Sequence, residues 1–503
     1  MTDITAGERG DAPGEPPSFG ARLKGAVIAP VMAMRIRYLP LLMVYFAYGA
    51  LGLVGIAESF WIKQELTMSP ADLAALGVWL TLPWTIKMVF GQVVDSVPLL
   101  GSQRRVYVFL GAALIAAGLL ILAGAAGGWF PKYGLDALYI AAKLLIVVGI
   151  VLQDVVADAM STEVVERENP DGTPRPKQEV EHELGMVQVL GRLALSFGIF
   201  AVAGIGGLLA KVYSYQVVFL LGLLVPAISI TGAILVKLDT VETKPVDWRI
   251  LGGGLVFGAA VAALGLGKVP YSQELIFLVS MTVVIAMLFR VTGELDHNAK
   301  QKIFFAAVII FVFRATPGVG EGYRWFTIDV FGFDEAFYGT LAQIGAGLAM
   351  AGTWLLADTI TRRPIASVLL FLTILYTVLS LPNLALVYRL DEWTEQAFGF
   401  GAHTIALLDT AAESPFAQLS MIPMLTLIAI HAPEGRRATW FALMASLMNL
   451  ALIAGQLQTK YLNLFFDVDR GQYADLPMLV VVAVALGFFA PLAVIVLFGR
   501  RAT

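Results

Sequence analysis

Long apolar runs separated by short polar segments dominate the chain. A helix needs about 20 mostly apolar residues to cross the hydrocarbon core of a bilayer. The first half of the chain contains such runs at Leu39–Trp61, Leu73–Val94, Val106–Gly127, Leu135–Met160, Leu184–Ala210 and Gln216–Val236. The second half contains them at Lys302–Trp325, Glu335–Ala357, Ile365–Tyr388, Gly401–Ile430, Thr439–Tyr461 and Pro477–Phe498.

Two shorter, glycine-rich apolar segments lie between these sets, at Ile250–Gly267 and Glu274–Val291. They either cross the membrane or form a re-entrant or interfacial pair. If both cross, the chain has fourteen transmembrane helices in a 6+2+6 arrangement. The pattern predicts an all-α polytopic membrane protein. Its expected regions are a disordered cytoplasmic tail (1–34), a six-helix half (35–236), a central linker with two extra helices (237–300) and a second six-helix half (301–503).

Positive charges set the expected orientation. Clusters of Lys and Arg recur in alternate loops, which places those loops and both chain ends in the cytoplasm. The clustered residues are Arg35, Arg37, Arg104, Arg105, Arg167, Arg175, Lys177, Lys237, Lys244, Arg249, Arg290, Lys300, Lys302, Arg362, Arg363, Arg436, Arg437, Arg500 and Arg501. The opposite loops carry single cations: Lys63, Lys132, Lys211, Lys268, Arg389 and Arg470. This alternation favours an even number of crossings between the two sixes.

The two sets of six resemble each other at a shift of 263 positions. The residues that coincide are Gly55 with Gly318, Glu58 with Glu321, Asp72 with Glu335 and Asp95 with Asp358. Chance similarity between glycine-rich apolar helices is the alternative explanation. Matches at one offset with the same topology favour a parallel repeat, in which an axis along the membrane normal relates two six-helix halves.

The composition narrows the class of protein. Hydrophobic residues make up 58% of the 503 residues, charged residues 14%, and the mean hydropathy is +0.78. A soluble domain has about 25% charged residues, so a soluble enzyme and a disordered chain are both excluded. The net charge of −4, without a basic stripe, argues against a nucleic-acid partner. The absence of Cys excludes disulfides and thiolate metal sites.

Ionisable groups inside a membrane are costly and therefore need an explanation. Lys143, Arg314 and Asp409 are expected at a similar depth, and Glu413 lies one helical turn below Asp409. The groups either pair as buried ion pairs or line a midplane cavity that holds a ligand. Glu321 and Arg324, near the outer end, are better explained as such a pair. The candidate substrate-binding residues are Glu58, Lys87, Lys143, Arg192, Arg314, Asp409 and Glu413, of which Asp409, Glu413 and Glu58 are also candidate proton carriers.

A second set of charges lies at the cytoplasmic ends of the predicted helices. Asp154 and Asp158 are four residues apart and share a helical face, near Arg104 and Arg105. Ion pairs among these groups would close the inner side and open it when they break, whereas solvated helix ends are the simpler alternative. The candidate gating residues are Asp95, Arg104, Arg105, Asp154, Asp158, Asp358, Arg362 and Arg363.

Signatures of catalysis are missing from the sequence. It has no Gly-x-Ser-x-Gly elbow and no GxxxxGK[ST] phosphate loop, which argues against a hydrolase and against ATP-driven transport. The histidines, His182, His297, His403 and His431, have no metal-ligand spacing. We therefore expect no catalytic residue, no metal and no cofactor.

Several motifs carry a family resemblance. The stretch from Leu82 to Lys87, followed by Asp95-Ser96-Val97-Pro98-Leu99, resembles the folate–biopterin transporter family of the major facilitator superfamily. The fourth-helix stretch Gln153 to Ala159 and the Pro433-Glu434-Gly435 entry to the eleventh helix are similar to motifs of that family. Muropeptide permeases carry related versions of the last two motifs.

The resemblance implies a secondary transporter in a membrane, which we expect to be the bacterial inner membrane. Its expected substrate is a folate- or pterin-like organic anion. We expect it to be moved by alternating access and coupled to protons, with the lipid bilayer around the protein. Cations would hold the substrate carboxylates, and a carboxylate would accept the N–H groups of the pterin edge. The expected state is monomeric. A muropeptide permease, and a non-transporting assembly factor or receptor on the same fold, are the alternatives.

Overall fold

The computed structural model describes residues 32, 34–102, 104–169, 171–235, 245–267, 269–293, 295–361, 363–416, 419–432 and 437–502. In these ranges the regular structure is helical, apart from isolated bridges in three loops. This confirms the all-α prediction. The predicted N-terminal tail lies almost entirely outside the described residues.

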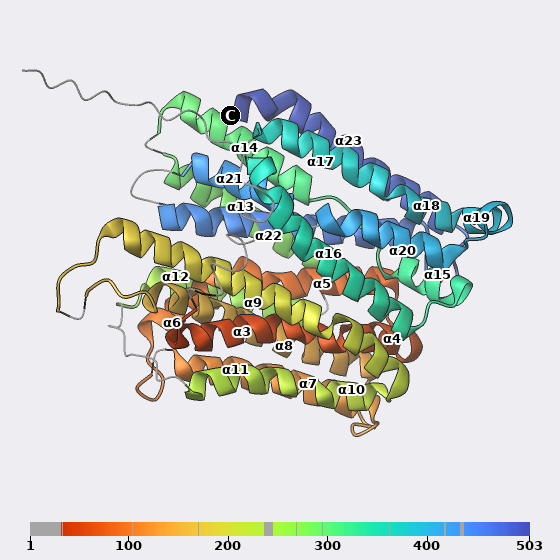
Figure 1. The fold of residues 1–503 in the computed structure, drawn as a ribbon, viewed down its shortest axis with the longest axis horizontal. Coiled ribbons are helices and arrows are strands. Elements are labelled where there is room, and N and C mark those ends of the chain that lie inside the picture. The colour runs from red at the N-terminus through yellow and green to blue at the C-terminus, as the bar shows by residue number, and fades with distance from the viewer. Residues whose placement is uncertain are drawn as a thin grey trace, which may run out of the picture.

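The first half contains helices at all six predicted positions (Figure 1). They are α3 (Leu39–Ala50), α4 (Gly55–Glu65), α5 (Pro70–Thr85), α6 (Lys87–Ser96), α7 (Arg105–Ala126), α8 (Leu135–Glu163), α9 (Lys177–Val212), α10 (Tyr215–Leu221) and α11 (Leu224–Leu235). The 3-10 turn η3 (Leu51–Val54) joins α3 to α4. Ser69 caps α5 in a reciprocal capping box with Asp72, which fixes the start of that helix.

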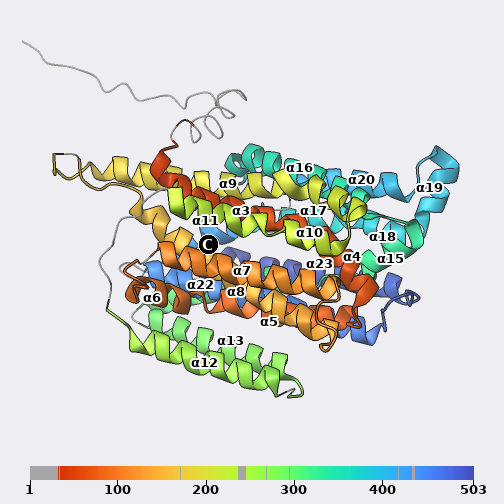
Figure 2. The same ribbon diagram turned by 90° about the horizontal axis from the view of Figure 1, so that it is seen from below.

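The middle pair forms two full-length helices, α12 (Trp248–Leu266) and α13 (Ser272–Val291). Both are long and apolar enough to cross a membrane. They lie together along one side of the molecule, at the bottom of Figure 2. The helix α12 contacts α6 of the first half, and α13 packs against α22 of the second half.

The described part of the second half is also built from helices. Its helices are α14 (His297–Arg314), α15 (Glu321–Phe331), α16 (Glu335–Thr361), α17 (Ile365–Leu379), α18 (Leu381–Val387), α19 (Leu390–Phe398), α20 (Ala402–Glu413), α21 (Met421–Ile430), α22 (Arg437–Phe465) and α23 (Leu476–Ala502). The described residues contain twelve helices long and apolar enough to span. The segments around α14–α15 and α16 are not among them, so the count of fourteen stays a prediction.

The predicted repeat is visible in the first helix of each half. In the first half this helix is interrupted at Leu51–Val54, and Glu58 lies in the first turn of α4 after the interruption. In the second half the helix stops at Arg314 and resumes at Glu321. Equivalent breaks at one sequence offset support two six-helix halves related as a parallel repeat.

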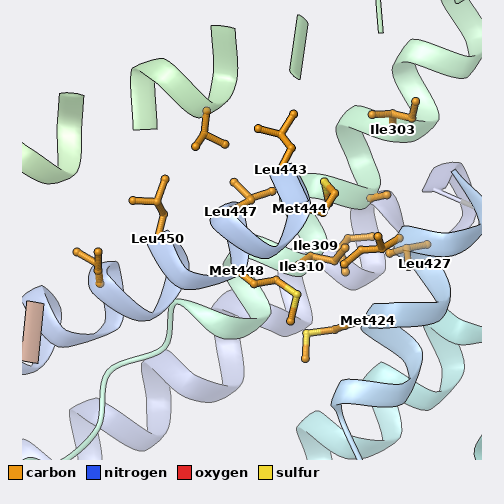
Figure 3. Packing of buried hydrophobic residues seen from close by; sticks show 14 of the residues in the cluster. Ile303, Ile309, Ile310, Met424, Leu427, Leu443, Met444, Leu447, Met448 and Leu450 are labelled. Carbon is orange, nitrogen blue, oxygen red and sulfur yellow. The ribbon is translucent and has the colours of Figure 1, made fainter. Parts of the chain in front are cut away.

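A hydrophobic cluster holds α14 in the second half. Ile309 and Ile310 of α14 are buried with Met424 and Leu427 of α21 and with residues of α22 that include Met448 (Figure 3). Both isoleucines are less than 3% exposed, so α14 has little freedom to rotate about its axis. This packing fixes the direction of Arg314, the last residue of the helix.

The most extensive contacts between the halves are those of α5 with α22 and of α9 with α16. We call the end of the molecule with the C-terminus and the start of α3 the terminal end, and the opposite end, with α4, α15 and α19, the distal end (Figure 1). Near the distal end α9 and α16 touch through their main chains. A Cβ atom added to Gly207 would lie 2.4 Å from the carbonyl oxygen of Glu335 and 2.5 Å from the Cα atom of Gly339.

Candidate functional site

A cavity of about 380 Å³ lies between the two halves. It is bounded by α4, α5 and α8 of the first half and by α22 and the α14–α15 break of the second. The polar residues that line it are Glu58, Ser59 and Tyr139 of the first half and Arg314, Thr316, Glu321, Gln456 and Thr459 of the second. Its volume is in the range of small-molecule sites.

On the first-half side, Glu58 is fully partnered. The Nζ atom of Lys143 lies 2.8 Å from its Oε1 atom, and the hydroxyl of Tyr139 donates to the same oxygen at 2.9 Å. Tyr139 and Lys143 are four residues apart on α8, so both reach Glu58 from one helical face. Tyr139 was not among the predicted site residues, although this spacing from Lys143 was a usable signal. The negative charge of Glu58 is therefore already balanced.

On the second-half side, the positive charge of Arg314 is not balanced by a carboxylate of the described residues. Among the described residues, no carboxylate lies within 4.0 Å of its guanidinium. Its Nη1 atom donates to the sulfur of Met421 at 3.1 Å, and its Nε atom is buried without a partner. The C-terminal end of α14 favours a cation there through the helix dipole. The cavity thus contains a positive charge that an anionic ligand would pair.

The break between α14 and α15 also shapes the cavity. Its unwound main chain is satisfied by α22: the hydroxyl of Thr459 accepts from the N–H of Gly318 at 2.9 Å, and the amide of Gln458 donates to the carbonyl of Ala315 at 2.5 Å. Irregular main chain at membrane depth is tolerated where protein covers it or where it lines a cavity. These contacts hold Arg314 and Glu321 at opposite edges of the break.

Glu321 is only weakly paired. The Nε atom of Arg324 lies 3.9 Å from its Oε2 atom, and the same guanidinium donates to the Ser59 hydroxyl of the first half at 2.5 Å. This agrees with the expectation that Glu321 and Arg324 pair near the outer end. It also leaves the Glu321 carboxylate able to accept further hydrogen bonds within the cavity.

Polar contacts between the halves close the distal end. Lys63 binds Asp329 with 2.5 Å between Nζ and Oδ1, and Lys211 binds Asp334 with 2.7 Å between Nζ and Oδ2. The Tyr215 hydroxyl donates to Oε1 of Glu335 at 2.8 Å. The hydrogen bond from Lys211 holds the pKa of Asp334 below its ordinary value. The cavity lies beneath this layer of contacts.

The predicted inner gate has a different set of partners from the one expected. Pro83 lies inside α5, and the chain bends at Ile86 before α6 begins at Lys87. Lys87 thereby reaches α8, where its Nζ atom lies 2.5 Å from both Asp154 and Asp158. Among the described residues, Asp154 and Asp158 therefore share Lys87 as their ion-pair partner, whereas Arg104 pairs with other carboxylates.

The other predicted gating residues are scattered. Arg104 pairs with Asp95 at 3.0 Å and with Glu163 at 2.5 Å, all within the first half. The guanidinium of Arg105 lies 5.5 Å from the ring centroid of Phe109. Arg363 is exposed. The Asp358 side chain and Arg362 lie outside the described residues.

The remaining predicted substrate residues do not join the cavity. Asp409 and Glu413 lie on α20 and are not among the cavity-lining residues. The Oδ1 atom of Asp409 is buried without a hydrogen-bond partner, whereas Glu413 is exposed. Arg192 lies on α9 and is exposed. Of the seven predicted residues, the cavity unites Glu58 and Arg314, with Lys143 behind Glu58.

A major facilitator fold with a charged cavity between its halves defines a membrane transporter rather than an enzyme. The sequence profile of the BT1 family matches residues 49–502, and the chain belongs to this family. This confirms the expected family.

Two relatives match most of the chain. The folate-biopterin transporter of Synechocystis sp. is 26% identical over 453 residues, which cover 88% of this chain and 78% of the relative. The probable folate-biopterin transporter 4 of Arabidopsis thaliana is 22% identical over 468 residues, covering 87% and 90%.

Solved structures of similar fold are transporters of the POT type. A POT family transporter in complex with 5-aminolevulinic acid matches with a TM-score of 0.61 and 15% identity, covering 93% of this chain and 96% of that one. The peptide transporter POT in complex with sulfate matches with a TM-score of 0.59 and 15% identity, covering 97% and 96%. At this identity the likeness supports the fold and says nothing of the substrate.

Proposed function

We propose that this protein is a proton-coupled secondary transporter that moves a folate- or pterin-like organic anion by alternating access. The observation that carries the proposal is Arg314, a cation without a carboxylate partner among the described residues, which lines a cavity shared by both halves. An unpaired charge at membrane depth is costly unless a ligand pairs with it. The names of the relatives, folate-biopterin transporters, supply the substrate class.

The cavity offers the two kinds of group that a folate needs. A substrate carboxylate would bind the guanidinium of Arg314 through charge-assisted hydrogen bonds. The N–H groups of an aminopterin edge need a carboxylate acceptor, and Glu321 has more free accepting capacity than Glu58, which already accepts from Lys143 and Tyr139. We therefore assign the carboxylate end to Arg314 and the pterin edge to Glu321.

Alternating access follows from the arrangement of contacts. The ion pairs Lys63–Asp329 and Lys211–Asp334 join the halves at the distal end. At the terminal end, the ion pairs of Lys87 and Arg104 lie within the first half. We propose that the halves, residues 35–236 and 301–503, rock about the cavity, with both termini and the linker loops in the cytoplasm. This state is then the one closed to the outside.

A buried carboxylate without a fixed partner suits a proton carrier. The Oδ1 atom of Asp409 is buried without a hydrogen-bond partner, and Glu413 lies one helical turn away on α20. We propose that Asp409 exchanges the coupling proton. In Asp409→Asn, accumulation driven by a pH gradient should be lost while substrate binding persists. Full gradient-driven accumulation in this variant would assign the proton to another group.

Uptake by purified protein in liposomes tests the proposal. Radiolabelled folic acid should accumulate when the lumen is made alkaline, and Arg314→Ala should abolish that uptake. The control is Arg389→Ala, which removes an arginine whose ion pairs are with Asp391 and Glu392 of the same half. The proposal fails if Arg314→Ala takes up folic acid at the wild-type rate, or if the wild type takes up none.

A further inference from the structure

Arg470 lies in the loop between α22 and α23, yet its guanidinium binds the opposite half. It donates from Nη2 to the carbonyl oxygen of Ile62 at 3.0 Å, from Nε to that of Lys63 at 2.9 Å and from Nη1 to that of Met68 at 2.7 Å. Each distal contact described above joins one side chain to one residue of the other half, whereas Arg470 alone binds three.

Two of the three acceptors lie at the C-terminal end of α4. Ile62 and Lys63 belong to the last turn of α4, where helix carbonyls run out of partners from the helix itself. The carbonyl of Ile62 also accepts from the N–H of Leu66 at 3.2 Å, so Arg470 adds a second donor there. A cation at that position also interacts favourably with the helix dipole. Because all three acceptors are main-chain atoms, a substitution at those positions keeps the carbonyls, and only a change at Arg470 removes the contact.

The other face of the guanidinium rests on the second half. It lies 4.1 Å from the ring centroid of Trp325, a residue of α15 that is fully buried. A guanidinium that stacks on a desolvated indole gains cation–π energy in addition to its hydrogen bonds. Arg470 is therefore held between the end of α4 and the middle of α15.

These two short helices carry the cavity carboxylates: Glu58 lies on α4 and Glu321 on α15. We propose that Arg470 is a positioning residue that assembles the binding cavity when the distal end closes. This inference rests on the proposed alternating access. When Arg470 leaves the α4 carbonyls, the two halves of the cavity separate, and a ligand from the distal side meets each half alone. Closure then brings Glu58 and Glu321 to their places on either side of the ligand.

The natural absence of Cys permits a direct test of this role. A single cysteine at Leu80, a cavity-lining residue of α5, reports access to the cavity. The cysteine is labelled with a membrane-impermeant thiol reagent added to oriented membrane vesicles, in backgrounds with Arg470, Arg470→Met, Arg470→Lys and Arg389→Met. The last is matched in charge change and in its place at the distal end, but its ion pairs stay within the second half.

Arg470→Met should raise the labelling rate about tenfold or more, from the distal side alone, since hydrogen bonds to charged groups are among the strongest in proteins. Arg470→Lys keeps the charge and should give a smaller increase. Arg389→Met should label like the parent. The inference is overturned if Arg470→Met labels at the parental rate, if Arg389→Met shows the same increase, or if labelling rises equally from both sides. Labelling needs no substrate, so this result is independent of whether folic acid is transported.

Discussion

The Nζ atom of Lys143 lies 2.8 Å from the Oε1 atom of Glu58 across α8 and α4. Both side chains are mostly buried, with 21% and 11% of their surfaces exposed. The pair neutralises the carboxylate that the first half presents to the cavity. In the second half, no carboxylate among the described residues lies within 4.0 Å of the Arg314 guanidinium, so the two halves present different charges to the cavity.

Removal of Lys143 should therefore destabilise the fold. Lys143→Met leaves Glu58 charged and in contact with Tyr139 alone, which should cost about 1–3 kcal/mol of unfolding free energy. The double variant Glu58→Gln with Lys143→Met should recover most of that loss, because it leaves no unpaired charge. Thermal unfolding in detergent measures both. Lys132→Met, at an exposed loop position, is the control and should unfold like the wild type. A Lys143→Met variant as stable as the wild type would contradict the pairing.

Lys87 should contribute more to the stability of the fold than an ordinary surface lysine, because it is the shared ion-pair partner of two carboxylates. Asp154 and Asp158 lie one helical turn apart, and each is 2.5 Å from Nζ of Lys87. Lys87→Met should lower the midpoint of thermal unfolding by more than Lys143→Met does, since two like charges lose their common partner. Lys87→Arg should restore most of the stability. Equal midpoints for Lys87→Met and the wild type would show that the cluster is solvated and structurally neutral.

The close approach of α9 and α16 predicts a defect at Gly207. An added methyl group has no room beside Glu335 and Gly339. Gly207→Ala should therefore destabilise the closed state by about 1–3 kcal/mol and shift the conformational equilibrium toward distal opening. Spin labels at Lys132→Cys and Trp393→Cys, on distal segments of the two halves, report that opening as a longer distance. Gly185→Ala, in the same helix but with open space around it, is the control. The contact plays no part in closure if the two variants give the same distance distribution.

The pair Lys211–Asp334 predicts a pH dependence of distal closure. Because the hydrogen bond from Lys211 lowers the pKa of Asp334 in the folded state, its contribution is complete at neutral pH and is lost as the pH falls through that lowered pKa. The same spin-label distance should lengthen only when the pH is lowered from 7 to below the ordinary pKa range for an aspartate. In Asp334→Asn it should already be longer at pH 7 and should change less with pH. An Asp334→Asn variant with the wild-type pH response would remove this pair from the closure.

The helices were predictable from the sequence because a bilayer leaves an apolar segment few alternatives. An apolar run such as Val106–Gly127 has few alternatives to a spanning helix, and the structure has α7 at Arg105–Ala126. The match of Glu58 with Glu321 at one offset related the first helices of the two halves, but the breaks within these helices were not predicted. The charge-depleted composition directed attention to the few intramembrane ions, and two of these, Glu58 and Arg314, line the cavity.

The partners of those ions were not predictable, since they depend on bends and loops. The turn of Lys87 toward Asp154 follows from the bend near Pro83, which sequence depth alone does not reveal. Asp409 was expected beside Lys143 and Arg314 because the three have similar depths, yet the cavity excludes α20. Arg470 was visible only as a lone cation in a loop. Its role depends on three carbonyls that lie about 400 positions away in the sequence.

Binding of two ligands to two proteins tests the central claim most directly. Folic acid has glutamate carboxylates and a pterin ring, whereas 6-hydroxymethylpterin has the ring alone. Titration calorimetry should find that Arg314→Gln weakens folic acid about 10–100-fold, the loss expected for a charge-assisted hydrogen bond, and leaves 6-hydroxymethylpterin unchanged. Equal weakening of both ligands, or none of either, would contradict the assignment of Arg314 to the substrate carboxylate.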